Sequence, residues 1–282
     1  MERMNYSALV TAVCILSGCG GGGSSSAPVA VTSPPVAATN QSAGGIWSTQ
    51  YTITSGPNTG DVINAVAFIS ENGQYFEYGK NTGNGCAAIG FGQLSVNGNN
   101  LTGSGDYVSV QYTTVPGVTP NCVYPDGSNS GKTTISGNVS QRATATITGV
   151  DTTSRGSTLP AFTTTFSFSK QYLNSSSLSA IAGNYNDSGA TLNINANGVV
   201  FEQDANGCVI NGQVSIINAT YNAYAVTLTV QSCTGGNTAL NGVTLAGLIT
   251  LDTSQSPNSI AGGVSANVSG SPFAEIFDLP KM

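Results

Sequence analysis

The sequence offers few side chains for catalysis. No histidine occurs among its 282 residues, so a Ser-His-Asp triad, an imidazole base and the usual imidazole metal sites are excluded. The remaining candidates are carboxylates: Glu77 and Glu202 each follow a Phe and could in principle act as a pair, as in glycoside hydrolysis. Because adjacent strand residues point to opposite faces, we expect Phe76 and Phe201 to face the core and both Glu side chains to face water.

Other chemical motifs are incomplete. The segment Glu202-x-Asp204-x-Asn206-Gly207 has the alternating oxygen ligands of a calcium loop, but Gln213 occupies the position that needs a bidentate Glu, so a β-turn is the better interpretation. A Ser-Lys dyad has no motif behind it, and phosphate loops and dinucleotide fingerprints are absent from the sequence. We predict no catalytic residue, metal or cofactor. Possible ligand contacts are Tyr75, Tyr78, Glu77 and Glu202.

Composition narrows the class of protein. Charged residues make up only 7%, glycine reaches 36 residues, and seven basic against thirteen acidic residues give a net charge of −6. A typical globular protein has roughly a quarter charged residues. With no basic cluster, the chain would be repelled by a phosphate backbone, so we expect no nucleic-acid partner.

The N-terminal segment has the pattern of an export signal. Arg3 is followed by an apolar stretch from Ala8 to Leu16, which is too short to span a bilayer, and then by Leu16-Ser17-Gly18-Cys19. This resembles a bacterial lipoprotein signal peptide with a lipobox. The resemblance implies cleavage before Cys19, lipid on its thiol, and, because Gly20 is not Asp, an outer-membrane destination. It leaves open whether the protein faces the cell surface or the periplasm.

Residues 19–44 form the expected tether. After Cys19, residues 20–44 carry no charge and no periodicity, begin with Gly-Gly-Gly-Gly-Ser-Ser-Ser, and contain Pro28, Pro34 and Pro35. This composition is typical of a flexible spacer. We therefore divide the chain into a signal peptide (1–18), a lipidated tether (19–44) and two folded modules (45–173 and 174–282).

The rest of the chain has an all-β pattern. Seven Asn-Gly pairs separate short runs rich in Val, Ile, Thr, Tyr and Phe, and Asn-Gly favours the type I′ turns of β-hairpins. Residues 161–169 and 225–230 show the alternation of half-buried strands. We predict antiparallel meanders that close into small barrels or pack as β-sandwiches, because an open sheet would expose its edges and its apolar face.

The two modules are copies of one unit. Residues 72–77 are echoed by 197–202, 84–86 by 206–208, and 92–96 by 212–216, in the same order and at similar spacing. The Gly45-Ile46-Trp47 opening is similar to that of lipocalin-type barrels, and Gly183-Asn184-Tyr185 begins the second copy. Leu178, Ile181 and Tyr185 have helical spacing and predict a short helical turn that plugs one end of the second module.

Six cysteines divide between anchor and framework. Cys14 leaves with the signal peptide and Cys19 carries the lipid. The four others allow three pairings; a four-thiolate metal site is disfavoured because the sequence has no Cys-x-x-Cys. The repeat favours one disulfide in each copy, because Cys86 and Cys208 hold the same repeat position. The expected bonds are Cys86–Cys122 and Cys208–Cys233.

These observations predict a lipid-anchored bacterial envelope protein without enzymatic activity. Its expected role is binding or surface interaction, with the membrane as one partner through Cys19 and envelope proteins, surface proteins or glycans as the others. The alternative is a periplasmic carrier in which lipocalin-like barrels enclose a small ligand. A hydrolase using carboxylates or a Ser-Lys dyad is the third hypothesis.

Overall fold

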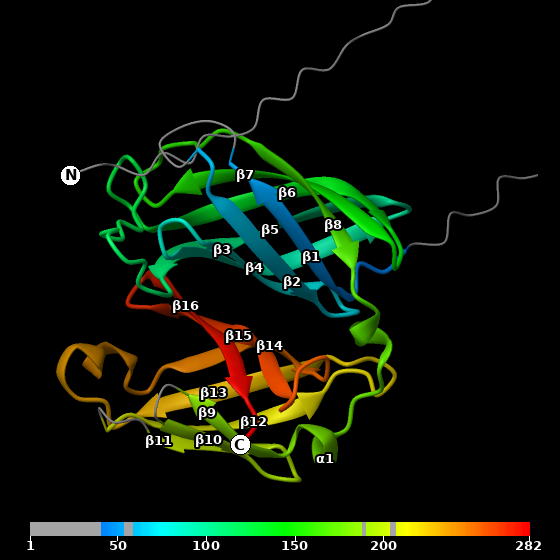
Figure 1. The fold of residues 1–282 in the computed structure, drawn as a ribbon, viewed down its shortest axis with the longest axis vertical. Helices are drawn as coiled ribbons and strands as arrows, with labels where there is room; N and C mark the ends of the chain where they lie inside the picture. The colour runs from blue at the N-terminus through cyan, green and yellow to red at the C-terminus, as the bar shows by residue number, and fades with distance from the viewer. Residues whose placement is uncertain (1–40, 54–58, 188–189, 204–206) are drawn as a thin grey trace, which may run out of the picture.

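The protein is built almost entirely of antiparallel strands. The structure is a computed structural model and describes residues 41–53, 59–187, 190–203 and 207–282. The lipobox and residues 19–40 of the expected tether therefore lie outside the described residues. The expected end of the tether is wrong, because residues 41–44 pack on the first module: Gln41 N donates to Gly98 O, and Ala43 is buried and accepts a hydrogen bond from Trp47 Nε1 (2.9 Å). Two modules follow one another along the chain and lie one above the other in Figure 1. Within the described part, none of the helices has the length and hydropathy needed to cross a membrane.

The first module is a closed eight-stranded barrel in which each strand pairs with the next along the chain. Closure comes from pairing of the first and last strands, with Trp47 opposite Phe168 and Ser48 opposite Ser167. The strands are β1 (Gly45–Thr52), β2 (Val62–Ile69), β3 (Gln74–Asn81), β4 (Cys86–Asn97), β5 (Asn100–Gln111), β6 (Ser130–Ser140), β7 (Thr144–Thr153) and β8 (Phe162–Phe168).

The second module is a curled sheet of eight strands, again in sequence order. Its two edge strands approach each other through a single bridge between Tyr185 and Lys281, and Met282 N donates to Asn184 O. The strands are β9 (Gly183–Asp187), β10 (Ala190–Ile194), β11 (Val199–Gln203), β12 (Val209–Ile216), β13 (Tyr224–Gln231), β14 (Thr244–Asp252), β15 (Ser259–Val268) and β16 (Ser271–Pro280). The prediction of an all-β protein with two modules is confirmed.

Short helical segments connect and cap the second module. The 3-10 helix η1 (Lys170–Leu173) and the helical turn α1 (Leu178–Ile181) lie between the modules in sequence, and η2 (Gly235–Leu240) follows β13. Ile181 is fully buried in the core of the second module, where Tyr185 donates a hydrogen bond from its hydroxyl to Ile181 O (2.6 Å). The predicted helical turn is therefore present, although Tyr185 belongs to β9.

The turns differ in one respect from the prediction. None of the described asparagines has a positive φ, so the Asn-Gly pairs whose Asn is described do not form type I′ turns. Between β2 and β3, Gly73 alone has a positive φ (84°), and its N–H donates to Ser70 O, as in a three-residue hairpin loop with Gly in the left-handed region. The pair at Asn211 lies inside β12 and makes no turn.

Both predicted disulfides are formed. Cys86 at the start of β4 is bonded to Cys122 in the loop 112–129, and Cys208 beside β12 is bonded to Cys233 after β13. Each bond lies within one module, as the repeat indicated.

A third apolar cluster joins the two modules. Phe68, Phe76 and Tyr78 on the outer face of the barrel belong to one buried cluster with Leu248 and Ala274 of the second sheet. Figure 1 shows β14, β15 and β16 adjacent to the barrel strands that carry these side chains. Burial of aromatic side chains in this cluster contributes roughly 1.5–3 kcal/mol each to the free energy of folding, so the modules stabilise one another.

Gly263 on β15 leaves the space that Phe76 occupies. A methyl group there would collide with the Phe76 ring and with the carbonyl of Glu275. We expect Gly263→Ala to lower the free energy of unfolding by about 1–3 kcal/mol, because the ring cannot keep its position. The matched control is Gly236→Ala, where a methyl group meets no atom within 4 Å. Chemical denaturation checks the difference, and equal stability of the two variants would contradict this account of the interface.

Candidate functional site

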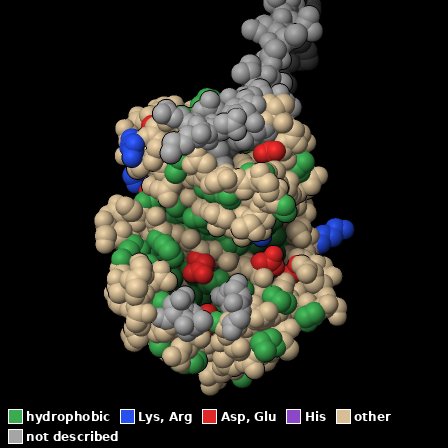
Figure 2. Space-filling view, turned by 60° about the vertical axis from the view of Figure 1, so that its left-hand side comes forward, with side chains coloured by type: hydrophobic (Ala, Val, Ile, Leu, Met, Phe, Trp, Pro, Cys, Tyr) green, Lys and Arg blue, Asp and Glu red, His purple; other side chains and the backbone are tan. Residues whose placement is uncertain are grey.

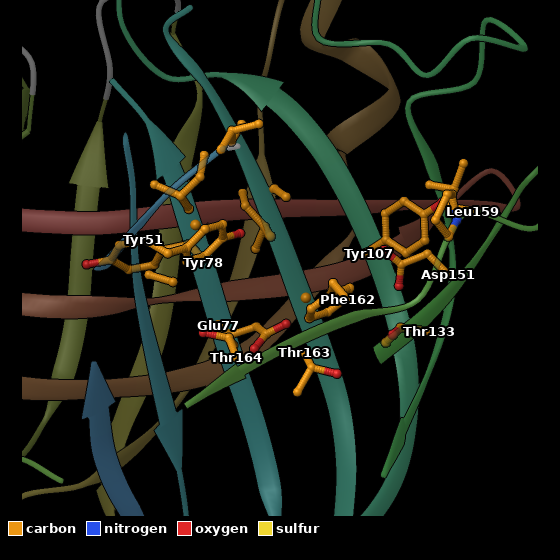
Figure 3. A pocket seen from close by; sticks show the side chains of 18 of the residues that line it. Tyr51, Glu77, Tyr78, Tyr107, Thr133, Asp151, Leu159, Phe162, Thr163 and Thr164 are labelled. Atoms are coloured by element: carbon orange, nitrogen blue, oxygen red, sulfur yellow. The ribbon is translucent and has the colours of Figure 1, made fainter. Parts of the chain in front are cut away.

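The barrel encloses a cavity of about 330 Å³. Figure 3 shows the side chains that surround it, contributed by strands from all sides of the barrel. Tyr51, Tyr107, Tyr124 and Phe162 supply aromatic surface, and Glu77, Asp151 and Thr133 supply polar groups. Cavities of about 300–1,000 Å³ with apolar walls and a few polar groups are typical of small-molecule sites.

Small inward-facing residues create this space. Ala65 on β2, Gly79 on β3 and Ala88 on β4 are direct neighbours across the sheet, so they form a row without large side chains. All three line the cavity. At the other end of the barrel, Trp47 and Phe166 fill the lumen as part of its buried core. The size pattern of inward residues therefore sets which end of the barrel is hollow.

Glu77 points into the lumen from the middle of β3. Its cross-strand neighbours are Ala67 and Gly90, and a Cβ atom at Gly90 would lie 2.8 Å from Glu77 Oε1. The carboxylate makes no hydrogen bond or ion pair with any of the described residues. Burial, with a smaller contribution from the charge of Asp151, raises the pKa of Glu77 from 4.5 to about 7.

Asp151 supplies a second carboxylate to the same cavity. It lies on β7 directly opposite Thr133 on β6, and a hydrogen bond from the Thr133 hydroxyl partly offsets the effect of burial. Burial nevertheless raises the pKa of Asp151. In Figure 3, Glu77 and Asp151 approach the cavity from different walls. The lumen therefore contains two acidic groups whose charged forms are disfavoured by their surroundings.

Tyrosine hydroxyls surround the acidic groups. The Tyr75 hydroxyl is buried without a hydrogen-bond partner among the described residues, and it packs over Gly105, where a Cβ atom would collide with it. Tyr107 lies at the cavity wall and packs edge-on against Tyr124, with ring centroids 5.4 Å apart. Burial, reinforced by nearby carboxylates, raises the pKa of Tyr75 and of Tyr107. Both tyrosines therefore remain protonated and keep a hydroxyl to donate.

The loop 112–129 brings Tyr124 to the cavity. Its position is fixed by the Cys86–Cys122 bond and by Asp126, which accepts hydrogen bonds from Ser128 N (3.0 Å) and Ser128 Oγ (2.6 Å) and also from Thr153. These hydrogen bonds keep the pKa of Asp126 well below its usual range. The disulfide thus connects β4 to a loop that contributes Tyr124 to the cavity wall.

The expectation for the two Phe-Glu pairs is wrong. Phe76 is buried, but in the cluster between the modules, whereas Glu77 faces the lumen. Phe201 is 48% exposed on the outside of the second sheet, and Glu202 is only 3% exposed on the inside. The two Glu side chains have the same orientation in each repeat. The expectation failed because each Phe lies on the outer face of its strand. The second module covers that face at Phe76, whereas the same face meets solvent at Phe201.

Glu77 and Glu202 do not form a catalytic pair. Glu202 lines a different cavity, of about 600 Å³, where the open end of the second module meets the outer face of β4 and β5. Apolar residues from both modules line it, among them Ile89, Val110 and Phe273. Figure 2 shows a hollow between the modules with hydrophobic and acidic side chains inside it.

The other predicted ligand contacts have different positions. Tyr75 lies in the core of the barrel beneath the cavity. Tyr78 borders the cavity, but its ring packs beside Phe68 on the outer face, and Lys80 Nζ lies 5.0 Å from its centroid. In the calcium-like segment, residues 204–206 lie outside the described residues. Among the residues that the structure describes, no group of three or more His, Cys, Asp or Glu side chains could hold a metal ion.

Sequence reasoning missed Asp151 and Thr133. A signal for Asp151 was present in β7, where Ala145, Ile147 and Gly149 alternate with Thr residues and place Asp151 on the same face. The alternation of this strand alone would have identified an acidic residue on the barrel interior.

Comparison with known proteins assigns no function to the chain. No family model, curated protein sequence or solved structure matches it. The side chains of the barrel interior therefore carry the functional inference.

Glu77→Gln should change how stability depends on pH. Because the pKa of Glu77 is raised to about 7, the folded state binds more protons than the unfolded state between pH 4.5 and 7. The stabilisation that protonated Glu77 contributes is fully present below pH 4.5 and is lost as the pH rises through about 7. We expect the free energy of unfolding of the wild-type protein to fall by roughly 3 kcal/mol across this window because of Glu77. The variant should not show this decrease.

Denaturant unfolding at several pH values checks this prediction. Asp106→Asn is the matched control, because Asp106 lies on the outside of the barrel, where Lys132 Nζ is 2.9 Å from its carboxylate. An unchanged pH dependence in Glu77→Gln would mean that the carboxylate is solvated in the folded state.

Proposed function

We propose that this chain is a non-enzymatic, lipid-anchored protein of the bacterial envelope that binds a small molecule inside its first barrel. The observation that supports the proposal most strongly is the 330 Å³ cavity with an unpartnered carboxylate, Glu77, in its wall. Eight-stranded barrels have an interior wide enough either to be filled by side chains or to contain one small ligand. At one end of this barrel, small inward-facing residues take the place of the large side chains that would otherwise fill the lumen.

The cavity walls favour binding over chemistry. Aromatic and aliphatic surface from Tyr51, Ile53, Ile63 and Phe162 provides apolar contact area, while isolated polar groups would fix the orientation of a ligand. Small-ligand carriage is one specific form of the binding role. The barrel with its Gly45-Ile46-Trp47 opening also keeps the resemblance to lipocalin-type carriers as part of this proposal.

The N-terminal segment supports placement at a membrane. Lipid on Cys19 would anchor the protein, and residues 20–40 would separate the two modules from the bilayer surface. Gly20 favours the outer membrane. A carrier on such a tether would meet its ligand in the periplasm or at the cell surface, where envelope proteins or glycans would be further partners.

Ala88→Phe should block ligand binding. Ala88 lines the cavity, so a phenyl ring there occupies the space that a ligand needs. The matched control is Ala143→Phe at an exposed turn outside the barrel. Fluorescence titration with the neutral apolar probe N-phenyl-1-naphthylamine checks the prediction. We expect saturable binding by wild type and control and at least a ten-fold loss in Ala88→Phe. Equal binding by all three proteins would place the probe outside the lumen, and chemical conversion of a bound ligand would contradict the non-enzymatic role.

Cys19→Ser should release the protein from the membrane. Without the thiol no lipid can be attached, so we expect the variant in the soluble fraction or retained as the uncleaved precursor. It should not incorporate a fatty-acid label. Cys14→Ser is the matched control, because the proposed cleavage removes Cys14. Cell fractionation and metabolic labelling measure both effects. A labelled Cys19→Ser protein would exclude the proposed lipidation site.

A further inference from the structure

We propose that the ligand of the barrel is a small organic cation, whose positive charge is balanced by Glu77 and Asp151; this inference rests on the proposed binding function. Both carboxylates line one cavity together with aromatic side chains. The proposal selects one charge class, so it excludes fatty acids and other anions as preferred ligands.

The lumen has negatively charged groups and, in the part of the chain that the structure describes, no basic side chain to balance them. Among the described residues, no Lys or Arg lines the cavity. The basic residues of the described part have other positions and contacts: Lys80 with Asp278, Lys132 with Asp106, Arg142 with Tyr221, Arg155 with the Asp126 carbonyl, Lys281 with the Ala182 carbonyl, and Lys170 at the exposed start of η1. No protein cation is therefore placed to neutralise the two carboxylates.

Burial of the two carboxylates is energetically costly. An ionised carboxylate inside a protein is strongly unfavourable unless it is paired or hydrogen-bonded. Glu77 has no partner among the described residues, and Asp151 has one hydrogen bond, from Thr133. A bound cation supplies the missing charge, so part of its binding free energy comes from relieving this penalty. A neutral ligand would leave the penalty in place, and an anion would increase it.

The walls of the cavity favour an organic cation over a metal ion. Tyr51, Tyr107, Tyr124 and Phe162 line the cavity, and aromatic faces attract ammonium groups through cation–π contacts. The described residues offer two carboxylates here and no larger cluster of metal-ligating side chains. An alkylammonium ion with an apolar body fits these walls better than a hydrated metal ion, which requires many oxygen ligands.

Binding of a cation should be coupled to proton release. The groups around Glu77 are Asp151 from β7, Tyr75 on its own strand and Tyr107 from β5, and its neighbours on β2 and β4, Ala67 and Gly90, do not titrate. Burial raises the pKa of Glu77 to about 7, and a nearby cation favours the ionised form. Affinity for a cation should therefore rise as pH increases from 6 to 8. For each proton that binding releases, the rise is at most about ten-fold per pH unit.

The test uses three probes with the same ring and different charge: benzylammonium, benzyl alcohol and benzoate. Each is titrated against the full-length protein by ligand-observed NMR, in competition with N-phenyl-1-naphthylamine. We expect benzylammonium to bind at least ten-fold more tightly than either of the others. Its advantage over benzyl alcohol should increase from pH 6 to pH 8, over which benzylammonium keeps its charge.

Two substitutions test the assigned carboxylates. Glu77→Gln and Asp151→Asn should each reduce benzylammonium affinity about ten-fold or more and leave benzyl alcohol affinity within about two-fold. Asp106→Asn on the outer face is the matched control and should change neither. Circular dichroism of each variant reports whether the barrel is still folded.

The outcomes separate the two proposals. Equal or tighter binding of benzyl alcohol or benzoate would overturn the cation inference while leaving ligand binding in the lumen intact. Failure of all three probes and of N-phenyl-1-naphthylamine to bind would overturn both proposals. Tight benzylammonium binding that survives both Glu77→Gln and Asp151→Asn would show that the cation binds elsewhere, for example in the cavity lined by Glu202.

Discussion

Closure of the first sheet is the constraint on which the rest of the structure depends. Once β1 pairs with β8, every strand of that sheet has one face toward a confined lumen and one face outward. Large side chains cannot all enter the lumen, so aromatic residues of β2 and β3 remain outside as an apolar surface. The second module covers this surface with β14, β15 and β16. The association of the modules is thus a consequence of how the barrel distributes its aromatic side chains.

Much of the fold could be predicted because local chemistry determines it. The alternating strands, the duplication, the two intramodule disulfides and the helical turn at Leu178 depend on short-range patterns. The inward face of β3 could not be predicted in the same way. Its sequence Tyr75-Phe76-Glu77-Tyr78 places an aromatic residue on both faces, so hydrophobic alternation gives no preferred phase. The usual expectation that a Glu faces solvent then selects the wrong face.

The duplicated Glu shows that this orientation belongs to the repeat. In both modules the residue two positions before the Glu is buried in its own module: Tyr75 in the barrel and Val200 in the curled sheet. The residue between them faces outward, where Phe76 is covered by the other module and Phe201 meets solvent. Sequence comparison of the copies reveals that the two positions are equivalent. It cannot reveal which face is interior, because in the first module that depends on closure of the sheet by strands distant in sequence, where Trp47 pairs with Phe168.

Glu77 is informative about function because it opposes stability. An apolar side chain of similar size would fill part of the lumen and would carry no desolvation penalty, as replacements of buried charged groups in other proteins indicate. Residues that break the rules of core packing without local compensation are concentrated at functional sites. Gly90 strengthens the argument, since a Cβ atom there would crowd Glu77 Oε1. A glycine inside a strand weakens that strand, so the barrel combines two locally unfavourable residues at one place. Their common effect is a carboxylate displayed to an apolar cavity, and the proposed recognition of a ligand would account for both residues.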